Sequence, residues 1–179
     1  MGKSLLLTGY PGIGKTTIVR HVIDALDSDA LGGFYTAEIR GPGGRKGFKL
    51  VTLDGKETVL AHKDFRDPKA PRVGRYGVDV AAFERVGVAA LQRAMDEGKL
   101  VVVDEIGKME LFSQLFQETL MRAFLGPHHV LGTITGKPHP AADVFRYLAQ
   151  VEIWEVDRRN RDTMPARVLK WLAKEIALG

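Results

Sequence analysis

The sequence predicts an α/β fold: a largely parallel sheet with helices on both of its faces. Two observations support this prediction, the alternation of short apolar runs with helical patterns and one run that is near-continuously β-branched. That run, LVVVD at 100–104, has no polar face, which is typical of a strand buried on both sides in a parallel sheet. A chain of 179 residues can bury a core of its own. We therefore predict a single domain over 1–179, in which strands and helices alternate.

The parallel part of the sheet is predicted from four apolar runs, and the helices from the segments that separate them. The strands are expected at 4–8, 100–104, 129–135 and 151–156. The helices are expected at 15–27, 80–97, 112–125, 140–149 and 163–178. In the last helix, Thr163 is placed to cap the N-terminus and Pro165 lies in the first turn, where its missing N–H is tolerated. One face of that helix is apolar and carries Val168, Leu169, Trp171, Leu172 and Ile176.

Between 33 and 63 the pattern changes to short strands, which we interpret as an antiparallel insertion within the domain. The strands are GFYTAEIR at 33–40, GFKLVTL at 47–53 and ETVLAH at 57–62. A glycine-rich turn joins the first two, and Asp54-Gly55 joins the second to the third, which is a strong hairpin signal. The segment that follows, 64–77, is polar and is expected to be a loop that covers a site.

The composition limits the partners and the compartment that we expect. The formal net charge is +4 and the isoelectric point about 9.4, an excess too small and too dispersed to require a nucleic acid, although it suits an anionic ligand. The chain has no cysteine, which excludes disulfides and thiolate metal sites. No apolar stretch reaches the roughly 18 residues of a membrane span, and the N-terminus lacks the pattern of a signal peptide. We therefore expect a cytoplasmic monomer that does not associate with a membrane.

The first predicted strand is followed by a glycine-rich loop with the spacing G-x-x-x-x-G-K-T, which is typical of phosphate binding. Glycines allow successive backbone N–H groups to point at phosphate oxygens, because a Cβ would intrude there. The helix that follows adds its positive dipole end. Lys15 would bridge the β- and γ-phosphates, and the Thr16 hydroxyl would coordinate Mg²⁺. The residues predicted to bind a nucleotide here are Gly9, Tyr10, Pro11, Gly12, Ile13, Gly14, Lys15 and Thr16.

A second stretch, LVVVDEIGKMEL, contains the carboxylates that a metal and an attacking water would need. Asp104 and Glu105 end the predicted buried strand, at the edge where α/β sheets bind their ligands. Asp104 fits a residue that holds Mg²⁺ through a water, and Glu105 fits a general base that deprotonates a water for attack on the γ-phosphate. Lys108 follows in a tight turn. It could reach a phosphate or pair with Glu110, and a solvated surface lysine is an almost equal interpretation.

Other polar clusters are weaker candidates. Thr133 and Thr135 end a predicted strand where a polar residue can sense the γ-phosphate, although a structural threonine is the more frequent case. The run after the last strand, DRRNRD, contains the arginines Arg158, Arg159 and Arg161. One of them could act as an arginine finger, but a basic run between a strand and a helix is more often solvated. The basic turn at 40–49 favours solvent or a contact beside the nucleotide.

Together these motifs resemble the small P-loop nucleoside-triphosphatases, a thermophile-type family that includes the human cancer-related nucleoside-triphosphatase. The resemblance rests on LLLTGYPGIGKTT, GGFYTAEIR, RKGFKLV, GRYGVD, VVVDEIGKMEL, GTI and RNRD, in that order over nearly the whole chain. It implies a three-layer RecA- or AAA-like domain that needs Mg²⁺ and hydrolyses ATP, GTP, CTP and UTP with little base preference, and diphosphates less well. It marks Gly9–Thr16 as one nucleotide-binding stretch. The other consists of Val101, Val102, Val103, Asp104, Glu105, Ile106, Gly107 and Lys108.

Three functions follow from these residues. The first is an Mg²⁺-dependent nucleoside-triphosphatase, with Lys15 and Glu105 in catalysis and Thr16 and Asp104 on the metal. The second is a small-molecule or nucleotide kinase that binds its acceptor at 64–77. A kinase would not need Glu105, and the sequence shows no clear arginine-rich lid. The third is a slow nucleotide switch that reports to a protein or RNA, which the lack of a dedicated basic stripe disfavours.

Overall fold

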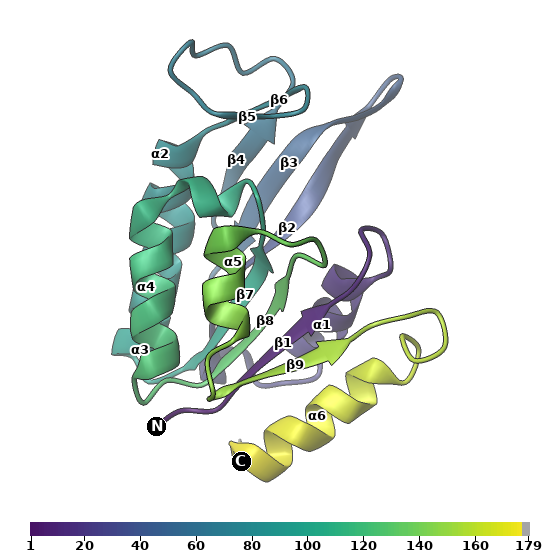
Figure 1. The fold of residues 1–179 in the computed structure, drawn as a ribbon, viewed down its shortest axis with the longest axis vertical. Coiled ribbons are helices and arrows are strands. Elements are labelled where there is room, and N and C mark those ends of the chain that lie inside the picture. The colour runs from purple at the N-terminus through teal and green to yellow at the C-terminus, as the bar shows by residue number, and fades with distance from the viewer. Residues whose placement is uncertain (177–179) are drawn as a thin grey trace.

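The computed structural model describes residues 1–176, and within that range it contains a nine-stranded sheet with the order β5-β6-β4-β3-β2-β7-β8-β1-β9 (Figure 1). The strands are β1 (Ser4–Thr8), β2 (Leu31–Gly41), β3 (Gly44–Thr52), β4 (Glu57–His62), β5 (Arg72–Val73), β6 (Tyr76–Val78), β7 (Leu100–Ile106), β8 (Val130–Ile134) and β9 (Val151–Glu155). The helices are α1 (Lys15–Asp24), α2 (Val80–Phe83), α3 (Ala89–Asp96), α4 (Gln114–Leu125), α5 (Pro140–Arg146) and α6 (Met164–Glu175). In the part of the chain that is described, none of the helices has the length and apolar character needed to cross a bilayer.

The sheet has a parallel half and an antiparallel half, which meet at β2. Strands β2, β7, β8, β1 and β9 run parallel, whereas β3, β4, β6 and β5 extend the sheet in antiparallel fashion. The first part of β2, 31–34, pairs with β7, and the part from 34 to 41 pairs with β3. Gly33 permits this junction, because its φ is +112° and a Cβ there would overlap the carbonyl oxygen of Val102. One strand therefore belongs to both halves.

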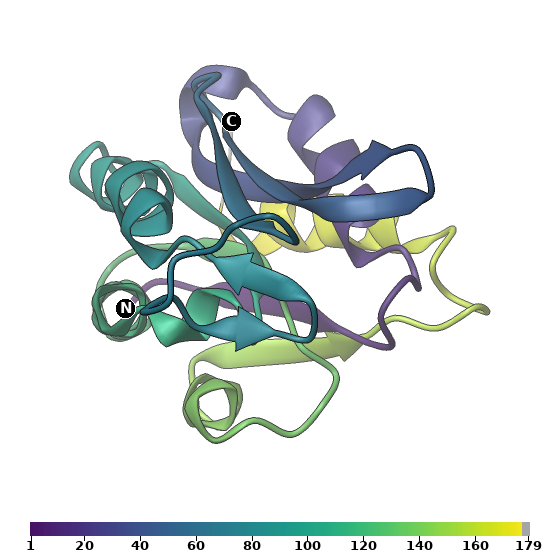
Figure 2. The same cartoon turned by 90° about the horizontal axis from the view of Figure 1, so that it is seen from above.

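Helices cover both faces of the sheet, as the sequence predicts (Figure 2). Helices α1 and α6 lie on one face, and α3, α4 and α5 lie on the other. The side chains of β7 show the alternation directly: Val101 and Val103 join the core under α3 and α4, whereas Leu100 and Val102 join the core under α1 and α6. The predicted α/β fold is confirmed.

The segment 64–77, which the sequence predicts as a loop, contributes to the sheet. Strands β5 and β6 form a hairpin, and β6 pairs with Ala61 and His62 of β4. Tyr76, Gly77 and Val78 are all buried in this arrangement. The pattern is too short to be recognised along the chain, because its pairing partner is what defines it as a strand.

The predicted helix at 80–97 is interrupted by a π-helical turn at Glu84–Val88. Gly87 lies in this turn, and a Cβ there would come within 2.7 Å of the Leu50 side chain on β3. The wide turn thus lets the helix approach the sheet closely. Helix α4 starts at Gln114 because the Ser113 hydroxyl accepts a hydrogen bond of 3.0 Å from a backbone N–H of its first turn. The last predicted helix is present as α6, and its expected residues 177–178 lie outside the described residues.

Phe116 of α4 lies at the centre of an aromatic cluster with Phe34 and Phe83. Its substitution shows how strongly the stability of the fold depends on this cluster. Its side chain is fully buried, and its ring centroid is 5.1 Å from that of Phe83 and 6.4 Å from that of Phe34. We expect Phe116→Ala to lower the free energy of unfolding by about 3–5 kcal/mol, since it leaves a cavity that neighbours fill only partly. Phe112→Ala, at a side chain that is 41% exposed, should cost less than about 1 kcal/mol. Equal losses in urea denaturation would contradict this role of Phe116.

Candidate functional site

The parallel strands bring the predicted site residues to one edge of the sheet, where their carboxyl ends meet (Figure 1). The glycine loop 9–14 follows β1, and Asp104 and Glu105 lie near the end of β7. Thr133 lies near the end of β8, and the arginine-containing segment 157–161 follows β9. Residues that are far apart in the sequence thus form one edge, the place where α/β sheets bind ligands.

The glycine loop 9–14 has a backbone that only glycine supports at two key positions. Gly9 and Gly14 have φ values of +153° and +111°, in the region that side chains with a Cβ disfavour. A Cβ on Gly9 would also lie 2.6 Å from the carbonyl oxygen of Val156, which directly follows β9. Helix α1 begins at Lys15, immediately after the loop. Its first N–H groups lack helical partners and are therefore available to an anion.

Lys15 lies inside this loop, not in solvent. Lys15 is only 8% exposed, and its ammonium group donates a hydrogen bond of 3.0 Å to the carbonyl oxygen of Gly9. The positive charge also opposes the rise in the pKa values of Asp104 and Glu105 that burial causes. The lysine is therefore held at the place where the loop, the helix and the carboxylates meet.

Asp104 is fully buried and is held by groups from several elements. Its Oδ1 accepts hydrogen bonds from the hydroxyls of Thr16 at 3.2 Å and Thr133 at 2.6 Å. Its Oδ2 accepts a longer one, 3.5 Å, from the backbone N–H of Thr36 on β2. Burial raises the pKa of Asp104, and these donors together with Lys15 oppose that rise. The sequence indicated a possible role for Thr133 but gave no signal for Thr36, because the contact depends on how β2 and β7 pair.

Glu105 lies beside a second buried carboxyl, Glu110, for which sequence reasoning suggested only a pairing with Lys108. A Cβ on Gly107 would be 3.1 Å from an oxygen of each of the two carboxyls, so both groups face this glycine. Burial raises the pKa of Glu105, and the charge of Asp104 raises it further. Burial and then the charge of Glu105 raise the pKa of Glu110 well above its ordinary value.

The pairing of Glu110 with Lys108 is not found in the structure. Lys108 is exposed and Glu110 is buried, and no ion pair joins them within residues 1–176. The signal that could have identified Glu110 is its position between two apolar residues, Met109 and Leu111, in a motif that already carries Asp104. An acidic residue inside an apolar stretch has to be explained by a function or a partner.

The two threonines at the end of β8 differ in role. Thr133 contacts Asp104, whereas the carbonyl oxygen of Thr135 accepts a hydrogen bond of 2.5 Å from Arg146 of α5. Arg146 also donates to the hydroxyl of Thr8, the last residue of β1, at 3.4 Å. It thus joins α5 to two strand ends beside the glycine loop, a contact that the sequence does not indicate.

The other residues of the second predicted stretch have mainly packing roles in the structure. The side chains of Val101, Val102, Val103 and Ile106 are fully buried in the two cores. They support the strand end that carries Asp104. Because these side chains are buried, they could contribute to nucleotide binding only through the backbone and through the position of the strand. Their role in nucleotide binding stays a prediction.

A hollow of about 630 Å³ lies between the glycine loop and the segment after β9. Tyr10 projects beside it and is 81% exposed. The segment after β9 is fixed by Asp157, whose carboxylate accepts hydrogen bonds from the backbone N–H groups of Arg159 at 2.7 Å and Asn160 at 2.9 Å. The lining residues are Tyr10, Pro11, Gly12, Ile13, Asp157, Arg158, Arg159 and Arg161. The structure thus brings the predicted arginines next to the first half of the glycine loop.

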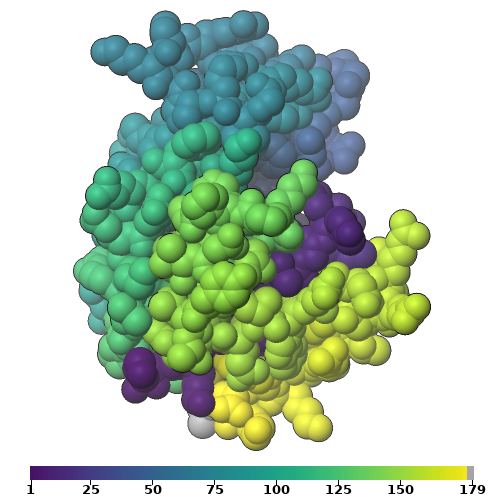
Figure 3. Space-filling model, viewed as in Figure 1, coloured from purple at the N-terminus to yellow at the C-terminus, as the bar shows by residue number. Residues whose placement is uncertain are grey.

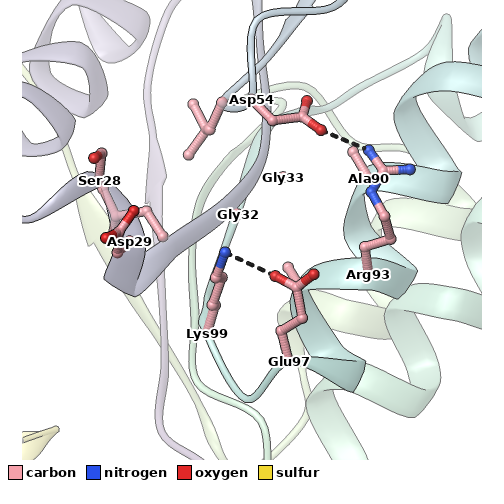
Figure 4. Close-up of a pocket in the computed structure, with 12 residues that line it drawn as sticks. Ser28, Asp29, Gly32, Gly33, Asp54, Ala90, Arg93, Glu97 and Lys99 are labelled. Carbon is pink, nitrogen blue, oxygen red and sulfur yellow. Dashed lines mark hydrogen bonds and ion pairs between the residues drawn. The ribbon is translucent and has the colours of Figure 1, made fainter.

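A smaller cavity of about 240 Å³ lies near the start of β2 and β7, at the opposite edge of the sheet (Figure 4). Ion pairs of 3.2 Å between Arg93 and Asp54 and of 2.7 Å between Lys99 and Glu97 lie across it. None of the residues that the sequence predicts for the site lines this cavity. The predicted site residues therefore lie away from this cavity, at the carboxyl edge of the parallel strands.

Comparison with known proteins identifies the relatives of this chain. A family model described as NTPase matches residues 4–169. Nucleoside-triphosphatase THEP1 of Thermotoga sp. (strain RQ2) is 40% identical over 168 residues, which are 94% of this chain and 94% of that protein. The crystal structure of THEP1 from Aquifex aeolicus has a TM-score of 0.86 and 35% sequence identity, over 94% of this chain and 98% of that one.

The human relative is similar over the same length. The solution structure of a human cancer-related nucleoside triphosphatase has a TM-score of 0.82 and 34% sequence identity, and the match covers 97% of this chain and 98% of that one. The resemblance found in the sequence motifs is thus confirmed both by sequence and by structure. Since the family model covers most of the chain and the relatives align along nearly its full length, this chain belongs to the NTPase family.

Proposed function

We propose that this chain is an Mg²⁺-dependent nucleoside-triphosphatase that hydrolyses ATP, GTP, CTP and UTP to the diphosphate and phosphate, and diphosphates more slowly. The observation that carries the proposal is the convergence of Lys15, Thr16, Asp104 and Glu105 at one edge of the sheet. The names of the relatives support the class of reaction. That the chain is a cytoplasmic monomer stays a prediction.

The glycine loop would bind the phosphates. Its backbone N–H groups and the first turn of α1 offer donors to phosphate oxygens. Lys15 would exchange its hydrogen bond with the Gly9 carbonyl for one with the β- and γ-phosphates. Because the lysine is already held in the loop, little side-chain entropy is lost when it binds a phosphate.

The oxygen atoms of Thr16 and Asp104 fit a magnesium ion. They are hard oxygen ligands that lie 3.2 Å apart, and Mg²⁺ prefers such ligands and usually completes its shell with water and substrate phosphates. When bound, the ion would supply positive charge next to the phosphates and the buried carboxylates.

Glu105 would act as the general base. As the oxygen of a water attacks the γ-phosphorus, the Glu105 carboxylate accepts a proton from that water, and the bond between the γ-phosphorus and the bridging oxygen breaks. The products are the diphosphate and inorganic phosphate. The raised pKa of Glu105 makes the carboxylate a stronger base than an exposed one.

The hollow beside Tyr10 would receive the base and account for low base selectivity. The exposed ring of Tyr10 and the guanidinium groups of Arg158, Arg159 and Arg161 offer surfaces on which any base can stack. The Oδ1 atom of Asp157 accepts hydrogen bonds from two backbone N–H groups, which fixes the orientation of this side chain beside the hollow. An arginine-finger role for one of these arginines stays a prediction.

Release of phosphate in the absence of an acceptor distinguishes hydrolysis from the kinase alternative. With purified protein, Mg²⁺ and each of ATP, GTP, CTP and UTP in turn, we expect release of inorganic phosphate at rates that differ by less than about tenfold, since stacking discriminates weakly between bases. Chelation with EDTA should abolish it. No release above background without an added acceptor, followed by label transfer to an acceptor, would contradict the proposal and favour a kinase.

Glu105→Gln tests the general base. The substitution preserves size and removes the proton acceptor, so we expect turnover to fall by about 10²- to 10⁴-fold. Nucleotide affinity, measured by titration of a fluorescent ATP analogue, should stay within a few-fold of the wild type. Glu118→Gln on the exposed face of α4 is the matched control and should leave both quantities unchanged. Wild-type turnover in Glu105→Gln would remove this residue from its role.

Glu110→Gln tests the electrostatic strain of the buried carboxyls. The pKa of Glu110 is raised in the folded protein, so above the ordinary value of 4.5 the unfolded chain releases a proton that the folded protein retains. This group therefore lowers stability progressively as the pH rises from about 4.5 toward its folded pKa. We expect Glu110→Gln to be more stable than the wild type at pH 7, by more than about 1 kcal/mol, and nearly equal at pH 4, in urea denaturation. An equal difference at both pH values would contradict this.

A further inference from the structure

The positive charge of the chain is concentrated in one segment of the sequence. Residues 40–75 contain ten lysines and arginines and four aspartates and glutamates, a net charge of +6, whereas the whole chain has +4, so the remaining residues sum to −2. The expectation of a dispersed charge is therefore not met in the structure. This segment forms β3, β4 and β5 with their connections. The tip of the β2–β3 hairpin and the connection from β4 to β5 lie at the top of the molecule in Figure 1 and Figure 3, whereas the turn at Asp54 reaches the smaller cavity at the opposite edge of the sheet.

Two arginines in this segment are held by neutral oxygen atoms. Arg45 donates to the hydroxyl of Tyr76 at 3.0 Å, and Arg75 donates to the same hydroxyl at 3.2 Å and to the carbonyl oxygen of Arg45 at 3.0 Å. Both guanidinium groups also lie over the ring of Tyr76, at 5.5 and 5.3 Å from its centroid. Carbonyl and phenol oxygens fix the positions of the two cations without neutralising them. Glu38 pairs with Arg45 at 3.1 Å and offsets part of the charge.

Further cations extend this arrangement along the surface. Lys46 and Lys63 are neighbours, because the backbone N–H of Lys63 donates to the carbonyl oxygen of Lys46 at 3.0 Å. The ammonium of Lys63 lowers the pKa of Lys46, and Asp64 opposes this effect. Arg66 and Lys69, on the connection between β4 and β5, are exposed. We refer to Arg45, Lys46, Lys63, Arg66, Lys69 and Arg75 as the basic band.

We propose that the basic band binds the phosphodiester backbone of a single-stranded nucleic acid. Cations from two segments, 45–46 and 63–75, meet on one part of the surface, which suits several linked phosphates better than one small anion. The rings of Phe48 and Tyr76 are covered by the guanidinium of Arg45, at 4.8 and 5.5 Å from their centroids. These rings are not free to stack on bases, so recognition uses the backbone and is independent of sequence. The proposal does not depend on the proposed hydrolysis.

The proposal is tested by fluorescence anisotropy, which measures the affinity of the protein for a labelled oligouridylate at increasing KCl concentrations. The deoxyuridine oligomer of the same length is measured in the same way. Each phosphate contact contributes about 0.7 to the slope of log K against log salt. We therefore expect Arg45→Gln with Arg75→Gln to reduce the slope by about 1.4 and the affinity at low salt by at least about tenfold. Arg66→Gln with Lys69→Gln should reduce the slope and the affinity by the same amounts. Because these two side chains are exposed, this second variant tests the proposal even if the first one disturbs β6.

Lys170→Gln with Lys174→Gln on α6 is the matched control, with the same loss of charge on exposed lysines away from the band. This control should retain the wild-type slope and affinity. Equal binding of RNA and DNA supports contacts to the shared backbone, and tighter binding of RNA supports the same band with added contacts to the 2′-hydroxyl. No binding at low salt, an equal loss in the control, or displacement of the oligomer by polyglutamate at the same concentration of charge would overturn the proposal.

Discussion

The hydrogen bonds of one buried carboxylate, Asp104, hold the site of this protein together. They come from the first turn of α1, the end of β8 and the backbone of β2, so four elements are fixed relative to one another through a single side chain on β7. A carboxylate without exposure is expensive unless its lone pairs are satisfied. The threonine hydroxyls and the N–H of Thr36 reduce that penalty, and they also determine where the glycine loop lies relative to the strand ends.

The same edge of the sheet carries an electrostatic conflict. Burial raises the pKa values of Asp104, Glu105 and Glu110; the charge of Asp104 adds to the rise at Glu105, and the charges of Glu105 and Asp104 add to the rise at Glu110. Lys15 is the cation that opposes the rise at Asp104 and Glu105. A purely structural core would replace such a cluster with apolar side chains, since burying charge of one sign destabilises a fold. In the proposed function, its presence beside the glycine loop would be explained by ligands that carry charge themselves, a divalent cation and a polyphosphate.

The sequence predicted those parts of the molecule whose determinants are contiguous. The glycine loop follows from eight consecutive residues, and Asp104 and Glu105 follow from a valine-rich strand whose end must lie at the ligand edge. The contact of Thr36 with Asp104 could not be predicted, because it depends on the pairing of β2 with β7. The strands β5 and β6 are defined by pairing as well. The basic residues of 40–75 lie within one stretch of the chain, but Arg45 and Arg75 become neighbours only through the pairing of β3, β4, β6 and β5.

The double membership of β2 has an evolutionary consequence. Its residues 31–34 pair with β7 through backbone hydrogen bonds, and no residue larger than glycine fits at Gly33. The length and register of this part of β2 are therefore fixed. Beyond it, β2 and β3 pair only with each other and with β4, and their turn lies at 42–43, at the free end of the hairpin. Paired insertions or deletions at that turn would lengthen or shorten the hairpin, while the sheet edge that carries the glycine loop would keep its geometry. The antiparallel half can thus change in length without a change in the backbone that carries the glycine loop and Asp104.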